Sequence, residues 1–258
     1  MTHSPRIAQA FAGHGRRAAL MSYLMGGYPD PDASRACCAA AADSGADLIE
    51  LGVPFSDPLA DGPVIHSAAS DALAAGVTPD DVLSVCESVA ARVAVVLMVY
   101  ANVVLQAGLS TYAQRAAAAG AVGLIVPDLP HDEAGELRDA CDAQDLALVP
   151  LVAPNTARDR LEAIGEDARG FVYAVSLTGT TGERSVLPPE LPAMVEGVRA
   201  ATSLPVAVGF GISTSEHASA VADIADGVIV GSRVVRAAGE GGSAAVGELV
   251  AELAHALA

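Results

Sequence analysis

The chain has 258 residues, a length typical of one β/α barrel, although two ordinary domains would also fit. Hydrophobic residues make up 52 % of it and charged residues 17 %, which argues against a disordered chain. The formal net charge of −17 disfavours binding to nucleic acid or to an anionic membrane surface. Aromatic residues are only 3 % and Trp is absent, so no platform for stacking bases is expected.

Eight short apolar runs follow one another along the chain. Each is nearly continuous in hydrophobicity instead of alternating, which is typical of parallel strands buried on both faces. The runs are residues 19–25, 47–53, 93–100, 121–127, 146–152, 170–176, 205–210 and 227–232.

Ala-rich amphipathic segments lie between these runs and carry helix start signals. Ser110 precedes a helix to about Ala119, Asp132 and Glu133 open another, and residues 213–216 resemble a capping region. The last helix is expected from near Ser243 to the C-terminus, and an extra helix is expected before the first strand. Alternating β/α units without a linker predict one domain over residues 1–258, a single (β/α)8 TIM barrel. A doubly wound open sheet is the alternative, which the lack of a GxGxxG motif weakens.

The absence of sorting signals and of regular Cys spacing leads us to expect a cytoplasmic protein. The longest strongly apolar run, residues 93–101, is too short to span a bilayer, and residues 1–19 lack the apolar core of a signal peptide. The four Cys form no CxxC motif and are expected to be buried free thiols.

Two connections between a strand and the next helix are longer than packing requires. One runs from Gly52 to a helix near Pro79, and the other runs from Ser176 to Glu190. They follow the second and sixth strands, so they are expected at the C-terminal face of the barrel, where active sites are built. The second is rich in Gly, Thr and Ser, which favours a mobile lid over an inert flexible loop.

Glu50 is the most informative single residue. It lies within an apolar strand between Ile49 and Leu51, where a charged group is costly unless it is paired or functional. It is therefore a candidate catalyst, and the alternative is a structural Glu that backbone donors satisfy. Asp61, in the turn-forming sequence ADGP, is by itself more typical of an Asx turn, and the same holds for Asp57 and Asp128.

Two Gly-rich segments predict a phosphate site. Residues 209–213 follow the seventh strand and residues 231–233 follow the eighth. Gly lets the backbone approach a ligand closely, and N–H groups at helix N-termini bind phosphate without a side-chain cation. Loops after these two strands are the usual phosphate site of a β/α barrel, and the alternative is tight turns only.

Missing residues narrow the chemistry. All fourteen basic residues are Arg, so this chain can form neither a Schiff base nor a covalent link to pyridoxal phosphate through Lys. The six His form no HxH or HExxH motif, which argues against a dedicated metal site, and no GxSxG motif is present. Proton transfer by carboxylates on a phosphorylated substrate is what remains.

The segment Leu48–Gly62, LIELGVPFSDPLADG, resembles the signature of tryptophan synthase alpha chains. The resemblance extends over nearly the whole chain, in matching order. The further segments that carry it are GGYP (26–29), MVYAN (98–102), VPDLP (126–130), TGTTG (178–182), VGFGIS (208–213) and DGVIVGS (226–232).

The resemblance implies retro-aldol cleavage of indole-3-glycerol phosphate to indole and D-glyceraldehyde 3-phosphate, with no cofactor in this chain. By this resemblance Glu50 handles protons at indole C3 and at the glycerol hydroxyl, and Asp61 hydrogen-bonds the indole N–H. Tyr173 would lie beside the substrate, which completes the catalytic set. A small phosphorylated indole compound is thus the expected substrate.

The resemblance also implies the residues that bind this substrate. Thr181 matches a lid residue that closes onto Asp61, while Tyr23 departs from the frequent Phe and Thr180 from the commoner Val. The implied phosphate-binding positions are Gly182, Gly211, Gly231 and Ser232, and the implied walls of the indole pocket are Tyr23, Ile65 and Met98.

The implied partner is a tryptophan synthase beta chain that carries pyridoxal phosphate, in an alpha2beta2 heterotetramer. Indole would reach it through a tunnel, and Pro54, Asp57 and the expected lid would lie at or near the interface. Two alternatives are a free-standing indole-releasing lyase and a catalytically weak subunit that binds and regulates beta. The presence of Glu50, Asp61 and Thr181 argues against the weak subunit.

Overall fold

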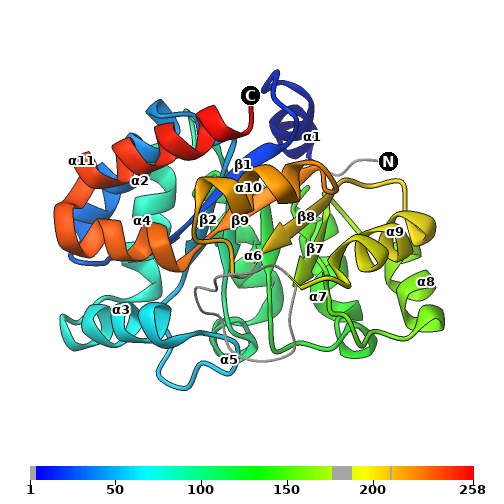
Figure 1. Cartoon of the computed structure of the whole chain (residues 1–258). Helices are drawn as coiled ribbons and strands as arrows, with labels where there is room; N and C mark the ends of the chain where they lie inside the picture. Colours follow the sequence, from blue (N-terminus) through cyan, green and yellow to red (C-terminus); the bar gives the residue numbers. More distant parts are fainter. Residues whose placement is uncertain (1–3, 176–187, 210) are drawn as a thin grey trace.

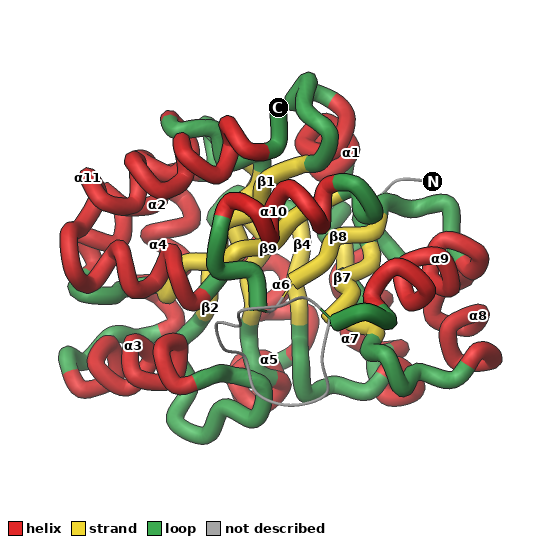
Figure 2. The backbone as a smooth tube through the Cα atoms, in the orientation of Figure 1, coloured by secondary structure: helices red, strands yellow, loops and turns green. Residues whose placement is uncertain are grey.

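Parallel strands form the centre of the molecule and helices surround them (Figures 1 and 2). The computed structural model describes residues 4–175, 188–209 and 211–258. Among these residues, nine strands form one sheet in the order β5-β4-β3-β2-β1-β9-β8-β7-β6, and neighbouring strands in this order are parallel. The strands are β1 Ala19–Met25, β2 Leu48–Gly52, β3 Ala94–Met98, β4 Gly123–Ile125, β5 Ala147–Leu148, β6 Leu151–Val152, β7 Val172–Val175, β8 Val206–Gly209 and β9 Gly227–Val230.

The two ends of this sheet are halves of one interrupted strand, and this closes the barrel. Val149 donates its backbone N–H to Leu124 of β4 at 2.9 Å, while the carbonyl of Pro150 accepts from Tyr173 of β7 at 3.0 Å. Proline has no N–H to donate to a ladder, which explains the break between β5 and β6. Each of the eight expected runs therefore supplies one barrel strand. The (β/α)8 fold is confirmed, and the open-sheet alternative is wrong.

Both faces of the strands are buried, against different partners. In β2, Leu48 belongs to the cluster inside the barrel with Met21 and Val96, whereas Ile49 and Leu51 belong to the cluster between the strands and the helices. Side chains alternate along a strand, so Glu50 shares the inner face with Leu48. This double burial accounts for the near-continuous hydrophobicity of the runs.

The helices begin where the sequence supplies caps. Asp30 accepts the N–H of Ala33 at the start of α2, Thr78 and Asp81 form a capping box, and Thr214 accepts from His217. The helices are α1 Pro5–Ala12, α2 Pro31–Asp43, α3 Pro63–Ala74, α4 Pro79–Val89, α5 Ala101–Ala107, α6 Leu109–Ala118, α7 Gly135–Asp142, α8 Arg158–Asp167, α9 Leu191–Ala201, α10 Ser215–Ala222 and α11 Ser232–Ala256, with a 3-10 turn η1 at His131–Glu133.

The expected extra helix, α1, packs against the N-terminal end of the barrel. Ile7 and Ala10 belong to the inner core cluster, and the ring of Phe11 lies 5.4 Å from that of Phe171. Arg6 donates a hydrogen bond to the carbonyl of Val93 at 2.8 Å, just before β3. The prediction of an N-terminal helix is confirmed, and this helix closes the end opposite the loops that follow the strands.

Several expected boundaries are wrong. The long connection from Gly52 to Pro79 contains α3, which starts at Pro63 because proline fits the first helical position. Asp132 and Glu133 lie in η1, and α7 begins only at Gly135.

The last helix begins at Ser232 instead of near Ser243. Gly242 interrupts it with non-helical angles (φ 61°, ψ −150°), so the expected start corresponds only to its second half. The expected lid, residues 176–190, falls mostly outside the described residues. Within the described ranges, no helix is long and apolar enough to cross a membrane.

Two glycines on the facing helices α8 and α9 test how tightly this outer layer packs. A Cβ added at Gly165 of α8 would overlap the carbonyl oxygen of Ala201, whereas one added at Gly197 of α9 meets nothing within 4 Å. We expect Gly165→Ala to lower the free energy of unfolding by about 1–3 kcal/mol through overpacking. Gly197→Ala should leave it unchanged or raise it by up to about 1 kcal/mol. Urea unfolding measures both, and equal stability of the two variants would contradict this packing.

Candidate active site

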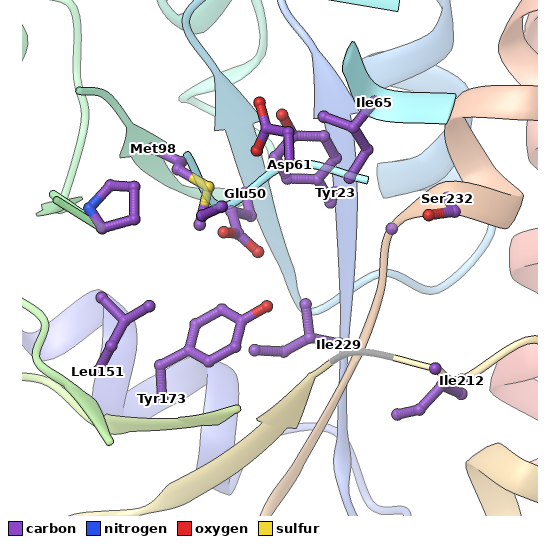
Figure 3. A pocket seen from close by; sticks show the side chains of 14 residues that line it. Tyr23, Glu50, Asp61, Ile65, Met98, Leu151, Tyr173, Ile212, Ile229 and Ser232 are labelled. Atoms are coloured by element: carbon purple, nitrogen blue, oxygen red, sulfur yellow. The ribbon is translucent and has the colours of Figure 1, made fainter. Parts of the chain in front are cut away.

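A pocket opens at the C-terminal ends of the strands, with about 590 Å³ of space not filled by protein atoms (Figure 3). It collects every predicted site residue that lies in the described part of the chain. Its lining residues are Tyr23, Glu50, Ala60, Asp61, Ile65, Met98, Pro127, Leu151, Tyr173, Gly211, Ile212, Ile229, Gly231 and Ser232. Two further predicted residues, Thr181 and Gly182, lie outside the described residues.

Glu50 lies on the inner face of β2 and is buried, with 1 % of its surface exposed. In the sheet it is paired with Tyr23 of β1 and Val96 of β3. Neither of its carboxyl oxygens accepts a hydrogen bond from any described residue. The alternative of a structural Glu satisfied by backbone donors therefore finds no donor in this part of the chain.

The surroundings of Glu50 favour its protonated form. Burial, and secondly the negative charge of Asp61, raise the pKa of Glu50 from its ordinary 4.5 to about 8. Burial disfavours the charged form because the low-dielectric interior solvates an ion poorly, and a nearby like charge acts in the same direction. At neutral pH this carboxyl carries a proton that it can donate to a bound molecule.

Asp61 lies on the loop 53–62, between β2 and α3, and its surroundings differ from those of Glu50. Burial raises the pKa of Asp61 above its ordinary value, while a hydrogen bond from the Tyr100 hydroxyl and the charge of His66 oppose part of this rise. When the surroundings of two carboxyls in one site have different effects on their pKa values, the two commonly take different acid and base roles.

Two tyrosines extend into the pocket from β1 and β7. Burial raises the pKa of Tyr23 and of Tyr173 well above the ordinary value, so both hydroxyls stay protonated. Figure 3 shows the Tyr173 hydroxyl and the Glu50 carboxyl pointing toward the same central space. The ring of Tyr23 crosses Gly52 and that of Tyr173 crosses Gly209, where an added Cβ would overlap the hydroxyls.

Sequence reasoning did not identify this use of Gly52 and Gly209. A glycine within a strand often marks a close approach of another group, and both stand at the last residue of a strand. It also missed Tyr100 and the apolar wall formed by Pro127, Leu151, Ile212 and Ile229. Nothing distinguishes these last residues from ordinary core residues in the sequence alone.

The far side of the pocket, away from Leu151 and Met98 in Figure 3, is formed by the loops after β8 and β9. Gly211 has a φ of +77°, a conformation that favours glycine. Gly231 is the N-cap of α11 and supplies no side-chain cap, so its first-turn N–H groups are not capped by a side chain. Such groups are suited to an anion. Arg233 instead donates to the carbonyl of Ser213 at 2.9 Å and ties the two loops together.

The other loop acids expected as turn residues lie outside the pocket. Asp57 is exposed and accepts a hydrogen bond from Ser56, and Asp128 accepts the N–H of Ala101 at 2.8 Å. In the described ranges, no group of three or more His, Cys, Asp or Glu is arranged to hold a metal ion.

Fold and site together define a class: a (β/α)8 barrel whose mouth holds a buried protonated carboxyl, a second carboxyl with a hydrogen-bond donor, and an uncapped helix N-terminus. The family model described as "Tryptophan synthase alpha chain" matches residues 10–256. This chain belongs to the tryptophan synthase alpha chain family, which places it in tryptophan biosynthesis.

Individual relatives agree over nearly the full length. The chain is 47 % identical to the tryptophan synthase alpha chain of Carboxydothermus hydrogenoformans over 234 residues, 89 % of this chain and 88 % of that one. It is 47 % identical to that of Halorhodospira halophila over 245 residues, 93 % and 90 % of the two chains. A structure of Mycobacterium tuberculosis tryptophan synthase is similar with a TM-score of 0.91 and 42 % identity, covering 99 % of this chain and 97 % of that one.

The burial of Glu50 makes stability depend on pH. Between its ordinary pKa of 4.5 and its folded pKa of about 8, Glu50 is protonated in the folded chain but ionised in the unfolded chain. Its contribution to the free energy of unfolding is therefore lost as pH rises through this window. We expect Glu50→Gln, which cannot ionise, to be a few kcal/mol more stable than wild type at pH 8, at about 1.4 kcal/mol per pKa unit.

Urea unfolding at pH 4.5 and pH 8 measures this difference, which should shrink toward the lower pH. Glu248→Gln is the matched control, because Glu248 is exposed on α11 and its substitution should change little. A Glu50→Gln variant whose advantage is the same at both pH values would contradict the assigned ionisation.

Proposed function

We propose that this chain is the alpha subunit of a tryptophan synthase and cleaves indole-3-glycerol phosphate to indole and D-glyceraldehyde 3-phosphate. The reaction is a retro-aldol cleavage, which makes the enzyme a carbon–carbon lyase. The observation that carries the proposal is the buried, protonated Glu50 at the mouth of the barrel beside Asp61. Family membership supports the same reaction.

The chemistry requires a proton donor and little else. A retro-aldol step needs an acceptor for the electrons of the breaking C–C bond. Once indole C3 is protonated, the iminium-like ring accepts these electrons, and the indole ring is restored as the bond breaks. The glycerol hydroxyl loses its proton as it becomes the aldehyde. Glu50 donates to C3 and then, as a carboxylate, takes the hydroxyl proton, a double use that suits a carboxyl whose pKa is near 8.

The other residues of the pocket bind and orient the substrate. Asp61, as a carboxylate, accepts the indole N–H and stabilises the positive charge that develops on the ring. Tyr23, Ile65 and Met98 pack against the indole, and the protonated Tyr173 hydroxyl lies beside the reacting carbons. The Tyr23 hydroxyl makes this wall more polar than the Phe frequently found in the family.

The phosphate of the substrate is assigned to the side formed by Gly211, Gly231 and Ser232, with Gly182 as a further expected contact. None of the described lining residues is cationic. Backbone N–H groups at the start of α11 and the Ser232 hydroxyl are therefore the available donors. The carboxyl and phosphate sites then lie at opposite sides of one pocket, as a substrate with an indole at one end and a phosphate at the other requires.

The proposal includes a beta chain as partner, in an alpha2beta2 heterotetramer, with pyridoxal phosphate on the beta chain and no cofactor in this one. Leu59 on the loop 53–62 is 78 % exposed and Leu105 on α5 is 62 % exposed. This loop contacts the start of α5, because Phe55 stacks on Tyr100. Exposed apolar side chains beside the pocket suit a partner surface that receives indole.

Steady-state release of indole from indole-3-glycerol phosphate, with and without a beta chain, tests the proposal. We expect measurable cleavage by the isolated chain and faster cleavage when beta is added. Full activity without beta would instead identify a free-standing lyase. Negligible cleavage even with beta would overturn the proposal and favour a subunit that only regulates beta.

Glu50→Gln tests the assigned acid. The amide cannot donate or take up a proton at neutral pH, so kcat should fall by at least about 100-fold while the circular dichroism spectrum is unchanged. Glu248→Gln, an exposed substitution on α11, should keep wild-type kcat. Unimpaired turnover by Glu50→Gln would refute its role.

A further inference from the structure

Tyr100 connects the end of β3 to the loop that carries Asp61. It is the residue immediately before α5 and is buried, with 3 % of its surface exposed. Its ring stacks on Phe55 of the loop 53–62, with ring centroids 5.1 Å apart and planes inclined by 23°. The ring therefore fixes the hydroxyl against this loop.

The hydroxyl of Tyr100 has two neighbours on the loop. It accepts the backbone N–H of Ala60 at 3.2 Å, and it donates a hydrogen bond to the carboxyl of Asp61. A phenol carries a single proton. Because the Ala60 N–H already points at the oxygen, the proton of Tyr100 goes to Asp61, which must accept it.

The backbone that follows Tyr100 is held as well. The Asp128 carboxylate, on the loop after β4, accepts the N–H of Ala101 at 2.8 Å. Three segments thus determine where the Tyr100 hydroxyl lies: β3, the loop 53–62 and the loop after β4. A hydroxyl held from several sides imposes its orientation on the carboxylate that accepts from it.

We propose that Tyr100 is a positioning residue for the reaction: its hydroxyl, oriented by Ala60 and Phe55, holds Asp61 in the pocket as a carboxylate and so leaves Glu50 as the protonated carboxyl. This inference rests on the proposed function for its catalytic meaning. The effect of the hydroxyl on which carboxyl is ionised, Asp61 or Glu50, does not depend on the substrate.

The electrostatic surroundings agree with this role. The groups that act on Asp61 or interact with its charge are Glu50, Tyr23, His66, Tyr100 and Tyr173. Burial is the largest influence on Asp61 and raises its pKa, and of the two causes that oppose this rise the Tyr100 hydrogen bond is the larger. Glu50 accepts no hydrogen bond from the described residues, and the charge of Asp61 contributes to its raised pKa. Loss of the Tyr100 hydroxyl would reduce the difference between the surroundings of the two carboxyls.

Tyr100→Phe tests the inference, because it removes the hydroxyl and keeps the ring that stacks on Phe55. The titration of Asp61 is followed by 13C NMR of labelled Asp carboxyls, assigned with Asp61→Asn, and kcat/KM is measured against pH. We expect the pKa of Asp61 to rise by about one unit and kcat/KM at pH 7 to fall about 10-fold. The acidic limb of the pH profile should move to higher pH, because the required carboxylate forms later.

Tyr112→Phe is the matched control. Tyr112 is a buried tyrosine of α6 whose hydroxyl has no hydrogen-bond partner among the described residues, and it does not line the pocket. Its loss should leave the Asp61 titration and the pH profile unchanged, which separates the role of Tyr100 from the general effect of removing a buried hydroxyl.

A wild-type titration of Asp61 and a wild-type pH profile in Tyr100→Phe would overturn the inference. The NMR titration needs no substrate, so it also separates this inference from the proposed function. If wild type fails to cleave indole-3-glycerol phosphate but the Asp61 titration still moves in Tyr100→Phe, the proposed function fails while the control of Asp61 by Tyr100 stands.

Discussion

The site depends on one unfavourable interaction, the burial of the Glu50 carboxyl inside a ring of apolar strands. Leu48 and Glu50 face the interior of the barrel together, so the same alternation that fills the core also places the carboxyl there. With no donor among the described residues, the carboxyl is most stable when protonated. The fold tolerates this cost because the interior cluster and the outer cluster under the helices bury apolar side chains on both faces of the strands.

The two carboxyls differ because they stand on different kinds of structure. Glu50 belongs to a strand with neighbours on both sides, which fixes it in an apolar layer. Asp61 belongs to a loop, where polar groups such as the Tyr100 hydroxyl can reach it without disturbing the strand ladder. Burial raises the pKa values of both, but the Tyr100 hydroxyl and the charge of His66 oppose this effect at Asp61. The strand position of Glu50 and the loop position of Asp61 thus give the two carboxyls the different surroundings that the proposed acid and anion roles require.

Burial makes the strands easy to predict from the sequence, but it does not reveal every residue of the site. Residues buried on both faces give continuous apolar runs, and a carboxyl such as Glu50 stands out within them. Asp61 does not stand out from Asp57 and Asp128, because all three occupy turn-forming segments and only tertiary contacts separate them. The role of Tyr100 is not predicted, because in the sequence a Tyr at the end of an apolar run is indistinguishable from a core residue.

The ends of helices are also predicted only in part from the sequence. The start of α3 follows from the Pro63 position, which resembles another loop proline until the helix behind it is recognised. The Gly-rich residues 239–243 indicate the break in α11 at Gly242, but they do not show that helix already begins at Ser232, before the break. Gly52 and Gly209 are needed only because tyrosine rings from neighbouring strands cross them, a constraint that appears once the sheet is assembled.

The protonated Glu50 and the lack of cationic residues among the described lining residues are physically linked. A cationic side chain within about 4–6 Å of a carboxyl lowers its pKa by about 1–3 units, which would ionise Glu50 at neutral pH and remove the proton donor. The anionic group of the proposed substrate must then be bound by weaker, local dipoles at a distance from the carboxyl. The uncapped start of α11, with Gly231 and Ser232, supplies such dipoles, while Arg233 is held away by the carbonyl of Ser213. In the proposed function, recognition of phosphate by backbone groups is therefore a consequence of keeping the buried acid protonated, in a chain whose net charge is already −17.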